Sequence, residues 1–328
     1  MAQIGSVVGI DVAKERLDVC VLPSGKERQV ANGAAGFVEL IAWLRERGVS
    51  AVVMEASGGY ERALAKALAG AGLAVRVVDP KRVRHYAKAL GRWAKNDRID
   101  ARMIALFGLA LTAEPERQAL PEDPAREPLA ALLAARQDLL EHQVGLQNQL
   151  QAMPAGPAQR ALAAVLAAIA DSVEQLDQLI RTAIAAHPPF AAVARRLASV
   201  PCLGPVTIAA LIAWLPELGR LHRRYIAALV GVAPFDDDSG RRQGQRYIAG
   251  GRGQLRKVLY MATMSGATRF NPALKAHYTK LLGRGKAPKV ALIACMRKLL
   301  GMLNAMLAHG QDWAPKLAAR QPPAAVAI

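Results

Sequence analysis

The chain has 328 residues, of which 52% are hydrophobic, and a formal net charge of +17. This length allows two domains with real cores, and this hydrophobic content excludes a disordered protein. No apolar run reaches the roughly 18 residues of a membrane span, and no basic-then-apolar leader is present, so we expect a cytoplasmic protein without membrane partners. The cysteines Cys20, Cys202 and Cys295 are solitary, which fits a reducing compartment.

Positive charge is concentrated in the C-terminal part of the chain. Residues 1–189 carry 22 Lys and Arg against 21 Asp and Glu, whereas residues 190–328 carry 21 against 5, a net of +16. Such a field binds polyanions in a salt-dependent way. The asymmetry therefore favours a nucleic-acid partner over a merely solubilising surface.

Residues 1–113 predict an α/β domain. Short apolar runs predict strands at 5–12, 17–22 and 27–31, and helical periodicity predicts a helix at 36–47. The pattern continues with a strand at 51–54, a helix at 60–69, a strand at 74–78 and a helix from 80 to about 90. This order fits a mixed sheet flanked by helices, as in a ribonuclease-H-like fold, although other α/β folds share it.

Four carboxylates in this domain indicate the chemistry that it could perform. Asp11 and Glu55 each close an apolar run that predicts a buried strand, and Asp97 and Asp100 lie three residues apart where a helix begins. Mg²⁺ prefers carboxylate oxygens, and phosphodiester cleavage needs several acids from separate elements. Singly, each acid also fits a strand end, a turn or a helix N-cap. Together they predict one divalent-metal site.

The middle of the chain predicts a linker followed by two long helices, which we assign to residues 114–189. Residues 114–128 contain four prolines among charges. A leucine- and glutamine-rich helix is predicted from 129 to 152, and a second from about 158 to 186 after a Pro/Gly break. This pattern predicts an antiparallel hairpin or coiled coil. Pairing within one chain and between chains stay equally open, because no heptad is sustained over three or four repeats.

Residues 190–315 predict a mostly helical domain, and residues 316–328 predict a disordered tail. Gly204 lies in a turn before an apolar helix predicted at 208–215, where backbone N–H groups can meet a phosphate. The turn fits a helix-hairpin-helix element that grips the DNA backbone, or equally a plain connection in the core.

Ser239 lies in a glycine-rich setting with three arginines close in sequence: Arg241, Arg242 and Arg246. A serine hydroxyl can attack a phosphodiester once it is deprotonated or the phosphate is polarised, and arginines bind phosphate bidentately. The composition of residues 236–240 also fits a polar surface turn.

A basic Gly-rich loop with Arg252, Arg256 and Lys257 is predicted ahead of a helix at 258–268. These three residues are candidate nucleic-acid contacts. No GxxxxGK[ST] sequence is present, so an NTPase has no support.

Four segments follow one another in a fixed order: Gly9–Lys14, Met54–Tyr60, Lys95–Ala101 and Pro234–Tyr260. In this combination, which spans nearly the whole chain, they resemble the IS110/IS116/IS902 transposases and the related Piv-type DNA invertases. The turn before residue 208 departs from the family, since Cys202 stands where a glycine is usual.

The resemblance implies a RuvC-like DEDD domain, a coiled coil and a C-terminal transposase domain. Its acids would be Asp11, Glu55, Asp97 and Asp100, binding Mg²⁺ or Mn²⁺, and Ser239 would form a transient phosphoserine link to DNA. The family recombines double-stranded target and donor DNA, which are chosen by a structured guide RNA from the element's own non-coding end. It works as a homo-oligomer, a dimer or tetramer of a prokaryotic, nucleoid-associated protein, with acids and serine drawn from different protomers.

Two other readings of the residues remain open at the level of sequence. A metal-dependent junction-resolving nuclease would use water in place of Ser239 and form no adduct with DNA. A non-catalytic nucleic-acid-binding protein would need none of the four acids. Transposase and site-specific invertase are not separated by the sequence.

Overall fold

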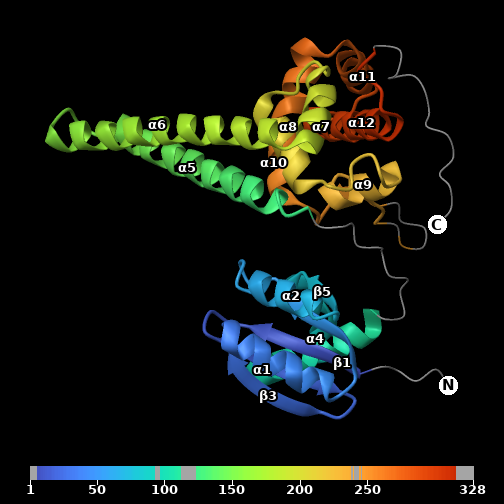
Figure 1. Cartoon of the computed structure of the whole chain (residues 1–328). Helices are drawn as coiled ribbons and strands as arrows, with labels where there is room; N and C mark the ends of the chain where they lie inside the picture. The colour runs from blue at the N-terminus through green and yellow to red at the C-terminus, as the bar shows by residue number, and fades with distance from the viewer. Residues whose placement is uncertain are drawn as a thin grey trace. The chain divides into compact units, whose positions relative to one another are not determined.

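The computed structural model describes residues 6–92, 97–111, 123–237, 239, 244 and 246–314. The chain divides into two compact units, Met1–Gln118 and Ala119–Ile328, which are taken separately below (Figure 1). The predicted tail at 316–328 and much of the predicted linker at 114–128 lie outside the described residues.

The N-terminal unit contains one five-stranded sheet in the order β3-β2-β1-β4-β5, formed by β1 (Ser6–Val12), β2 (Arg16–Leu22), β3 (Lys26–Ala31), β4 (Val49–Glu55) and β5 (Ala74–Val78). β1, β2 and β3 pair antiparallel, whereas β1, β4 and β5 pair parallel. The predicted mixed sheet is therefore confirmed, and its order agrees with a ribonuclease-H-like domain.

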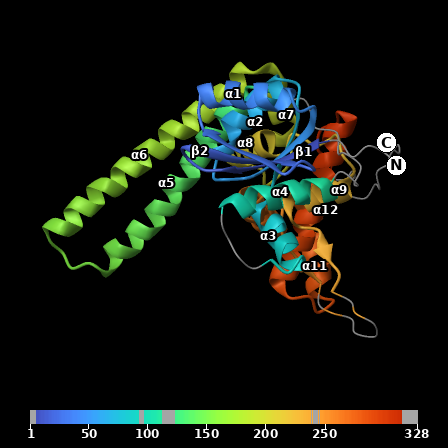
Figure 2. The same cartoon turned by 90° about the horizontal axis from the view of Figure 1, so that it is seen from below.

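Helices cover both faces of this sheet: α1 (Ala34–Arg45), α2 (Glu61–Gly70), α3 (Pro80–Ala89) and α4 (Asp97–Leu111). Alternate residues of β1 divide between the faces, as the period of two in a strand requires. Val8 and Ile10 pack with α1 and α2, while Val7 packs with α3 and α4. Figure 2 shows α1 and α2 on one side of the sheet and α4 on the other.

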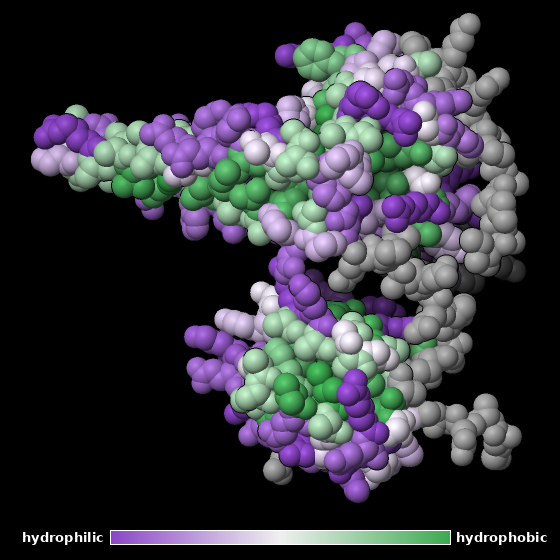
Figure 3. Space-filling view, viewed as in Figure 1, coloured by the Kyte–Doolittle hydropathy of each residue, from purple (hydrophilic) through white to green (hydrophobic). Residues whose placement is uncertain are grey.

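The C-terminal unit begins with two long antiparallel helices, α5 (Arg126–Ala152) and α6 (Pro157–Ala186). Leu129, Leu133 and Ile180 are their fully buried residues, all at the end that joins the rest of the unit. Apolar side chains continue along the hairpin in a band bordered by hydrophilic ones (Figure 3). The hairpin thus leaves part of its apolar surface accessible along its outer length.

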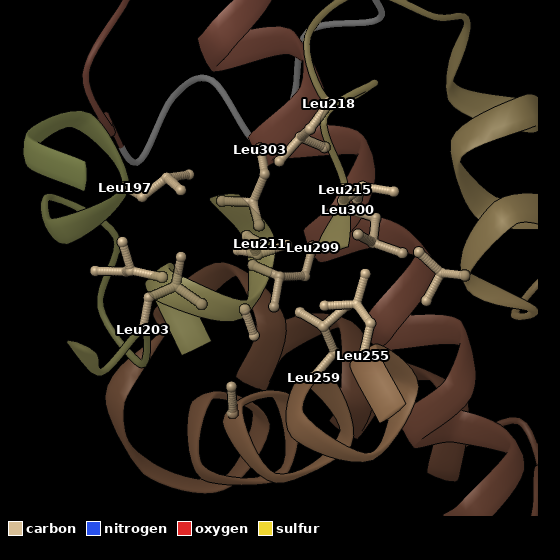
Figure 4. Packing of buried hydrophobic residues seen from close by; sticks show 14 of the residues in the cluster. Leu197, Leu203, Leu211, Leu215, Leu218, Leu255, Leu259, Leu299, Leu300 and Leu303 are labelled. Atoms are coloured by element: carbon tan, nitrogen blue, oxygen red, sulfur yellow. The ribbon is translucent and has the colours of Figure 1, made fainter. Parts of the chain in front are cut away.

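The rest of this unit is a helical bundle built around a leucine-rich core (Figure 4). Its elements are α7 (Pro188–Ala198), α8 (Pro205–Trp214), α9 (Arg223–Val230), α10 (Gly253–Ser265), the π-helix η1 (Gly266–Phe270), α11 (Pro272–Leu282) and α12 (Pro288–His309). A short ribbon of two antiparallel strands, β6 (Pro234–Phe235) and β7 (Tyr247–Ile248), lies between α9 and α10.

α12 is long and apolar enough to cross a membrane by length and composition alone. Leu299, Leu300 and Leu303 of this helix are at most 1% exposed and pack among the leucines of α8 and α10. These contacts identify α12 as the central core helix of its unit.

Three boundaries differ from the sequence prediction. α5 begins at Arg126, inside the predicted linker, and α8 begins at Pro205 because proline suits the first turn of a helix. α10 begins at Gly253 rather than 258, so the predicted basic loop is largely helix. The β6–β7 ribbon was not predicted, because each strand has only two residues and carries no readable alternation.

Candidate active site

Asp11 lies near the end of β1, on the face of the sheet that α4 covers. Val7 belongs to the core on this face, and Gly9 and Asp11 follow at the alternate positions. A Cβ on Gly9 would overlap the carbonyl oxygen of Ala101 and the backbone nitrogen of Ala105, so α4 lies against the backbone of β1 at this point. Glycine permits this close approach.

Along β1, successive residues on this face contact positions of α4 that lie progressively closer to the start of the helix. A Cβ on Gly108 would lie 2.9 Å from Cγ1 of Val7, whereas Gly9 meets Ala101, seven residues closer to the start of the helix. The next residue of β1 on this face is Asp11, and the next helical turn is the first turn of α4. The packing therefore leads Asp11 toward the turn that contains Asp97 and Asp100.

Glu55 is the last residue of β4, the parallel neighbour of β1. The register that pairs Ile10 with Met54 makes Asp11 and Glu55 the next positions on the two strands. Val53 packs on the α4 face, so Glu55, two residues on, is directed to the same face. Asp11 and Glu55 are both half-buried.

α4 begins at Asp97, as predicted, and the half-buried Asp100 lies in its first turn. The side chain of Asp97 is outside the described residues. Among the side chains that the structure does describe, no three His, Cys, Asp or Glu form a group able to hold a metal ion. The ends of β1 and β4 and the first turn of α4 thus lie at the same end of this sheet face, and the ligand set itself stays a prediction.

Asp18 is a fifth carboxylate at this end of the sheet face, and the sequence did not lead us to predict it. It lies opposite Asp11 in the β1–β2 register, and paired residues of antiparallel strands share a face. Its Oδ1 accepts a hydrogen bond of 2.7 Å from Nε2 of Gln29, and its Oδ2 lies 3.3 Å from Nε of Arg16. The alternation of side chains between the two faces of β2 could have predicted from the sequence that Asp18 shares a face with Asp11.

Glu61 organises the loop that follows Glu55, and it too was missed. Its side chain is 8% exposed, and Oε2 accepts hydrogen bonds from the backbone N–H of Ser57 (3.0 Å), the Ser57 hydroxyl (3.1 Å) and the backbone N–H of Gly59 (2.9 Å). Burial by itself raises the pKa of Glu61, but these bonds bring that pKa below its ordinary value. Gly58 and Gly59 have φ of 74° and 110°, which only glycine adopts freely.

Asn32 links the two loops that follow the acid-bearing strands. Its Nδ2 donates a hydrogen bond of 2.8 Å to the carbonyl of Ala13, after β1, and one of 3.4 Å to the carbonyl of Tyr60, after β4. The loops beside Asp11 and Glu55 are thus fixed to each other as well as to the sheet.

Ser239 belongs to the other unit, where it is exposed and forms a single β-bridge beyond the β6–β7 ribbon. Phe235 pairs with Tyr247 on the side of the ribbon that leads to Ser239, and exposed Arg246 lies 2.5 Å from the carboxylate of Asp236. Arg241 and Arg242 lie outside the described residues.

The other predicted basic contacts are held within the C-terminal unit. Arg252 forms a bidentate ion pair with Glu217, with distances of 2.6 and 2.5 Å, and donates to the carbonyl of Trp214. Burial by itself raises the pKa of Glu217, but its bonds to Arg252 bring that pKa below its ordinary value. Lys257 pairs with Glu141 of α5 at 3.0 Å.

Arg256 closes the turn between the ribbon and α10. Its Nη1 donates to the carbonyls of Gly250 (2.5 Å) and Gly231 (3.2 Å). A Cβ on Gly251 would overlap the backbone nitrogen of Gly231, so the two glycine turns pack directly on each other. These contacts give Arg256 a structural function at the root of the ribbon.

Gly204 is the N-cap residue of α8, in extended conformation, and the turn before it joins α7 to α8. Cys202 in this turn has φ of 92°, the left-handed region that glycine favours. Burial raises the pKa of the Cys202 thiol to about 11, so the sulfur packs as a neutral group.

Comparison with known proteins identifies the chain. A sequence model described as "Transposase" (DEDD_Tnp_IS110) matches residues 8–153, and one described as "Transposase IS116/IS110/IS902 family" matches residues 194–279. The pilin gene-inverting proteins of Moraxella lacunata and Moraxella bovis are each 27% identical over 315 residues, which cover 93% of this chain and 97% of theirs. An uncharacterised protein of insertion element IS116 from Streptomyces clavuligerus is 32% identical over 123 residues, 36% of this chain and 30% of its own length. The chain therefore belongs to the IS110/IS116/IS902 transposase family and is a DNA recombinase.

Proposed function

We propose that the protein cuts and rejoins double-stranded DNA through a phosphoserine intermediate at Ser239. The acids of the reaction would be the four carboxylates of the N-terminal unit: Asp11, Glu55, Asp97 and Asp100. The observation that carries the proposal is that two strand ends and the first turn of α4 bring these positions to one end of one sheet face. Oxygen donors from separate elements suit Mg²⁺ or Mn²⁺.

The serine step conserves a phosphodiester bond. Oγ of Ser239 gives up its proton and attacks the scissile phosphorus. The Oγ–P bond forms, and the bond from phosphorus to one deoxyribose oxygen breaks, so that this oxygen leaves as a hydroxyl. A deoxyribose hydroxyl from the second duplex then attacks the same phosphorus, which restores the serine and rejoins the DNA. A bound Mg²⁺ would supply charge neutralisation at the phosphate.

A suicide substrate tests the nucleophile. Duplex DNA nicked near the cleavage site loses a short fragment after attack, so a covalent protein–DNA adduct accumulates. We expect an SDS-stable adduct with the wild type in Mg²⁺, none with Ser239→Ala, and at least a hundredfold less with Asp11→Asn, because removing one group of a cooperating site removes most of its rate. An adduct with Ser239→Ala would disprove the serine assignment. Cleaved DNA without any adduct would favour the water-using nuclease.

Site-specific DNA inversion is the second candidate, since the relatives matched over nearly the whole chain are pilin gene-inverting proteins. Guidance by a structured RNA rests on the family resemblance. Purification from cells in which the flanking DNA is transcribed distinguishes the two. Bound RNA whose digestion abolishes recombination supports RNA-guided transposition, whereas RNA-independent recombination between two fixed sites supports inversion.

Assembly as a homo-oligomer is supported by the outer part of the α5–α6 hairpin. Val144 and Val165 are 57% and 48% exposed there. A second copy would remove this apolar surface from water. Sedimentation of the wild type at micromolar concentration should give a dimer or tetramer, and Val144→Lys/Val165→Lys should shift it toward monomer.

A further inference from the structure

One part of the C-terminal unit gathers basic side chains without any carboxylate. Between Asp238 and Asp312 the sequence contains 14 Lys and Arg and no Asp or Glu. Seven of these basic residues lie on α11, on α12 or in the connection between them. Residues 283–290 are all exposed, so this connection presents its charges to solvent.

The charges of the two helices overlap around His277, a half-buried residue of α11. Burial is the largest cause that lowers the pKa of His277, and the positive charges of Lys298, Lys280 and Arg297 lower it further. Lys280 comes from α11, whereas Arg297 and Lys298 come from α12. Nζ of Lys298 also donates a hydrogen bond of 3.5 Å to the carbonyl of Ala273 on α11, so positive charges of both helices lie around this part of α11.

Several basic residues elsewhere in the same unit form ion pairs with acids. Arg136 lies 2.6 Å from Asp177 across the hairpin, and Arg181 lies 3.2 Å from Glu174. No such partner exists on α11 or α12, because their sequence contains no acid. Uncompensated like charges repel and oppose folding. This cluster of positive charge therefore does not stabilise the fold, but it suits the binding of an external polyanion.

We propose that α11, α12 and the 283–287 connection form a docking surface for the phosphate backbone of duplex DNA. Duplex DNA is the polyanion that a recombinase must hold, and it offers about one negative charge per 1.7 Å of its axis. Flexible exposed lysines and arginines contact phosphates without reading bases. The surface would hold an arm of the substrate whatever its sequence. The proposal rests on the family's DNA recombination and not on Ser239 or the acids.

Salt-dependent binding tests the surface. The variant Lys280→Gln/Arg284→Gln/Lys286→Gln removes three exposed charges from it. Its matched control, Lys66→Gln/Lys81→Gln/Arg160→Gln, removes three exposed charges elsewhere. Fluorescence anisotropy with a 20-bp duplex in EDTA, from 50 to 300 mM salt, gives the slope of log Kd against log salt. We expect the first variant to lose about 2–3 units of slope, since each phosphate contact contributes about 0.9. The control should keep the wild-type slope.

A second readout shows where the DNA lies. The pKa of His277, followed by NMR on the full chain, should rise when the duplex is added, because phosphates offset the neighbouring positive charges. An unchanged slope in the first variant, or an unchanged His277 pKa in the wild type at saturating DNA, would overturn the proposal. If the first variant binds duplex DNA as the wild type does but no longer binds a 20-bp RNA duplex, the proposal is also overturned and the surface is assigned to RNA. EDTA keeps the result independent of the proposed metal chemistry.

Discussion

Glu61 is a buried carboxylate whose negative charge is stabilised by the loop that it organises. Its folded pKa lies below its unfolded value of about 4.3, so the charge stabilises the protein above that pH. The contribution is lost as pH falls through the folded pKa. We predict that Glu61→Gln lowers the free energy of unfolding by about 1–3 kcal/mol at pH 7. Urea titrations should show the difference shrinking between pH 5 and 3.

Glu39→Gln is the control for this prediction. Glu39 is exposed and pairs with Arg28 at 2.6 Å, and exposed pairs contribute about 0–1 kcal/mol. A loss for Glu61→Gln that is no larger than this control, or that does not depend on pH, would contradict the assignment.

Cys202 allows a test of backbone strain in which the loss of the sulfur is common to both variants. Cys202→Gly and Cys202→Ala both remove the sulfur, but only glycine adopts φ of 92° without strain. We predict that the glycine variant is more stable than the alanine variant by about 1 kcal/mol. Thermal unfolding of the two proteins measures the difference directly, and equal stability would show that the turn relaxes.

At the scale of elements, the contact between β1 and α4 determines where the acids lie. Gly9→Ala should push the helix from the strand, costing about 1–3 kcal/mol and most of the activity, because overpacking a tight contact shifts the backbone. Gly145→Ala is the matched control, because Gly145 lies in α5 with open space around it. It should raise the free energy of unfolding by about 0.5–1 kcal/mol. Chemical denaturation and the adduct assay provide both readouts. Full adduct formation by Gly9→Ala would show that this contact does not position the acids.

The sheet elements were predictable because apolar runs, turns and glycines agree locally. β1, β2, β3, β4 and β5 all lie within two residues of their predicted bounds. The proximity of Asp11 to Glu55 also followed from sequence, since ends of neighbouring parallel strands meet. The functions of Glu61 and Arg252 did not follow, because a hydrogen bond to a loop, or an ion pair 35 residues away, leaves no periodic signal.

At the scale of the whole molecule, the acids and Ser239 belong to different units. If each working site takes its acids from one protomer and its serine from another, two inactive variants can complement. We predict that a 1:1 mixture of the Asp11→Ala and Ser239→Ala proteins regains about a quarter of the wild-type adduct, because about one site in four then combines intact acids from one protomer with an intact serine from its partner. The suicide-substrate assay on co-refolded mixtures measures this recovery. No adduct above either variant alone would place acids and serine in one chain.

The ribbon that carries Ser239 is anchored to the C-terminal unit at its root. Its root is the pair of glycine turns held by Arg256, while residues 234–237, Ser239 and residues 246–247 are exposed. At about 3.3 Å per residue, Ser239 can stand some 13 Å from Phe235. None of these described residues belongs to the hydrophobic core, so we expect substitutions at them to leave the melting temperature unchanged. Loss of activity in a ribbon variant can therefore be attributed to chemistry rather than to unfolding.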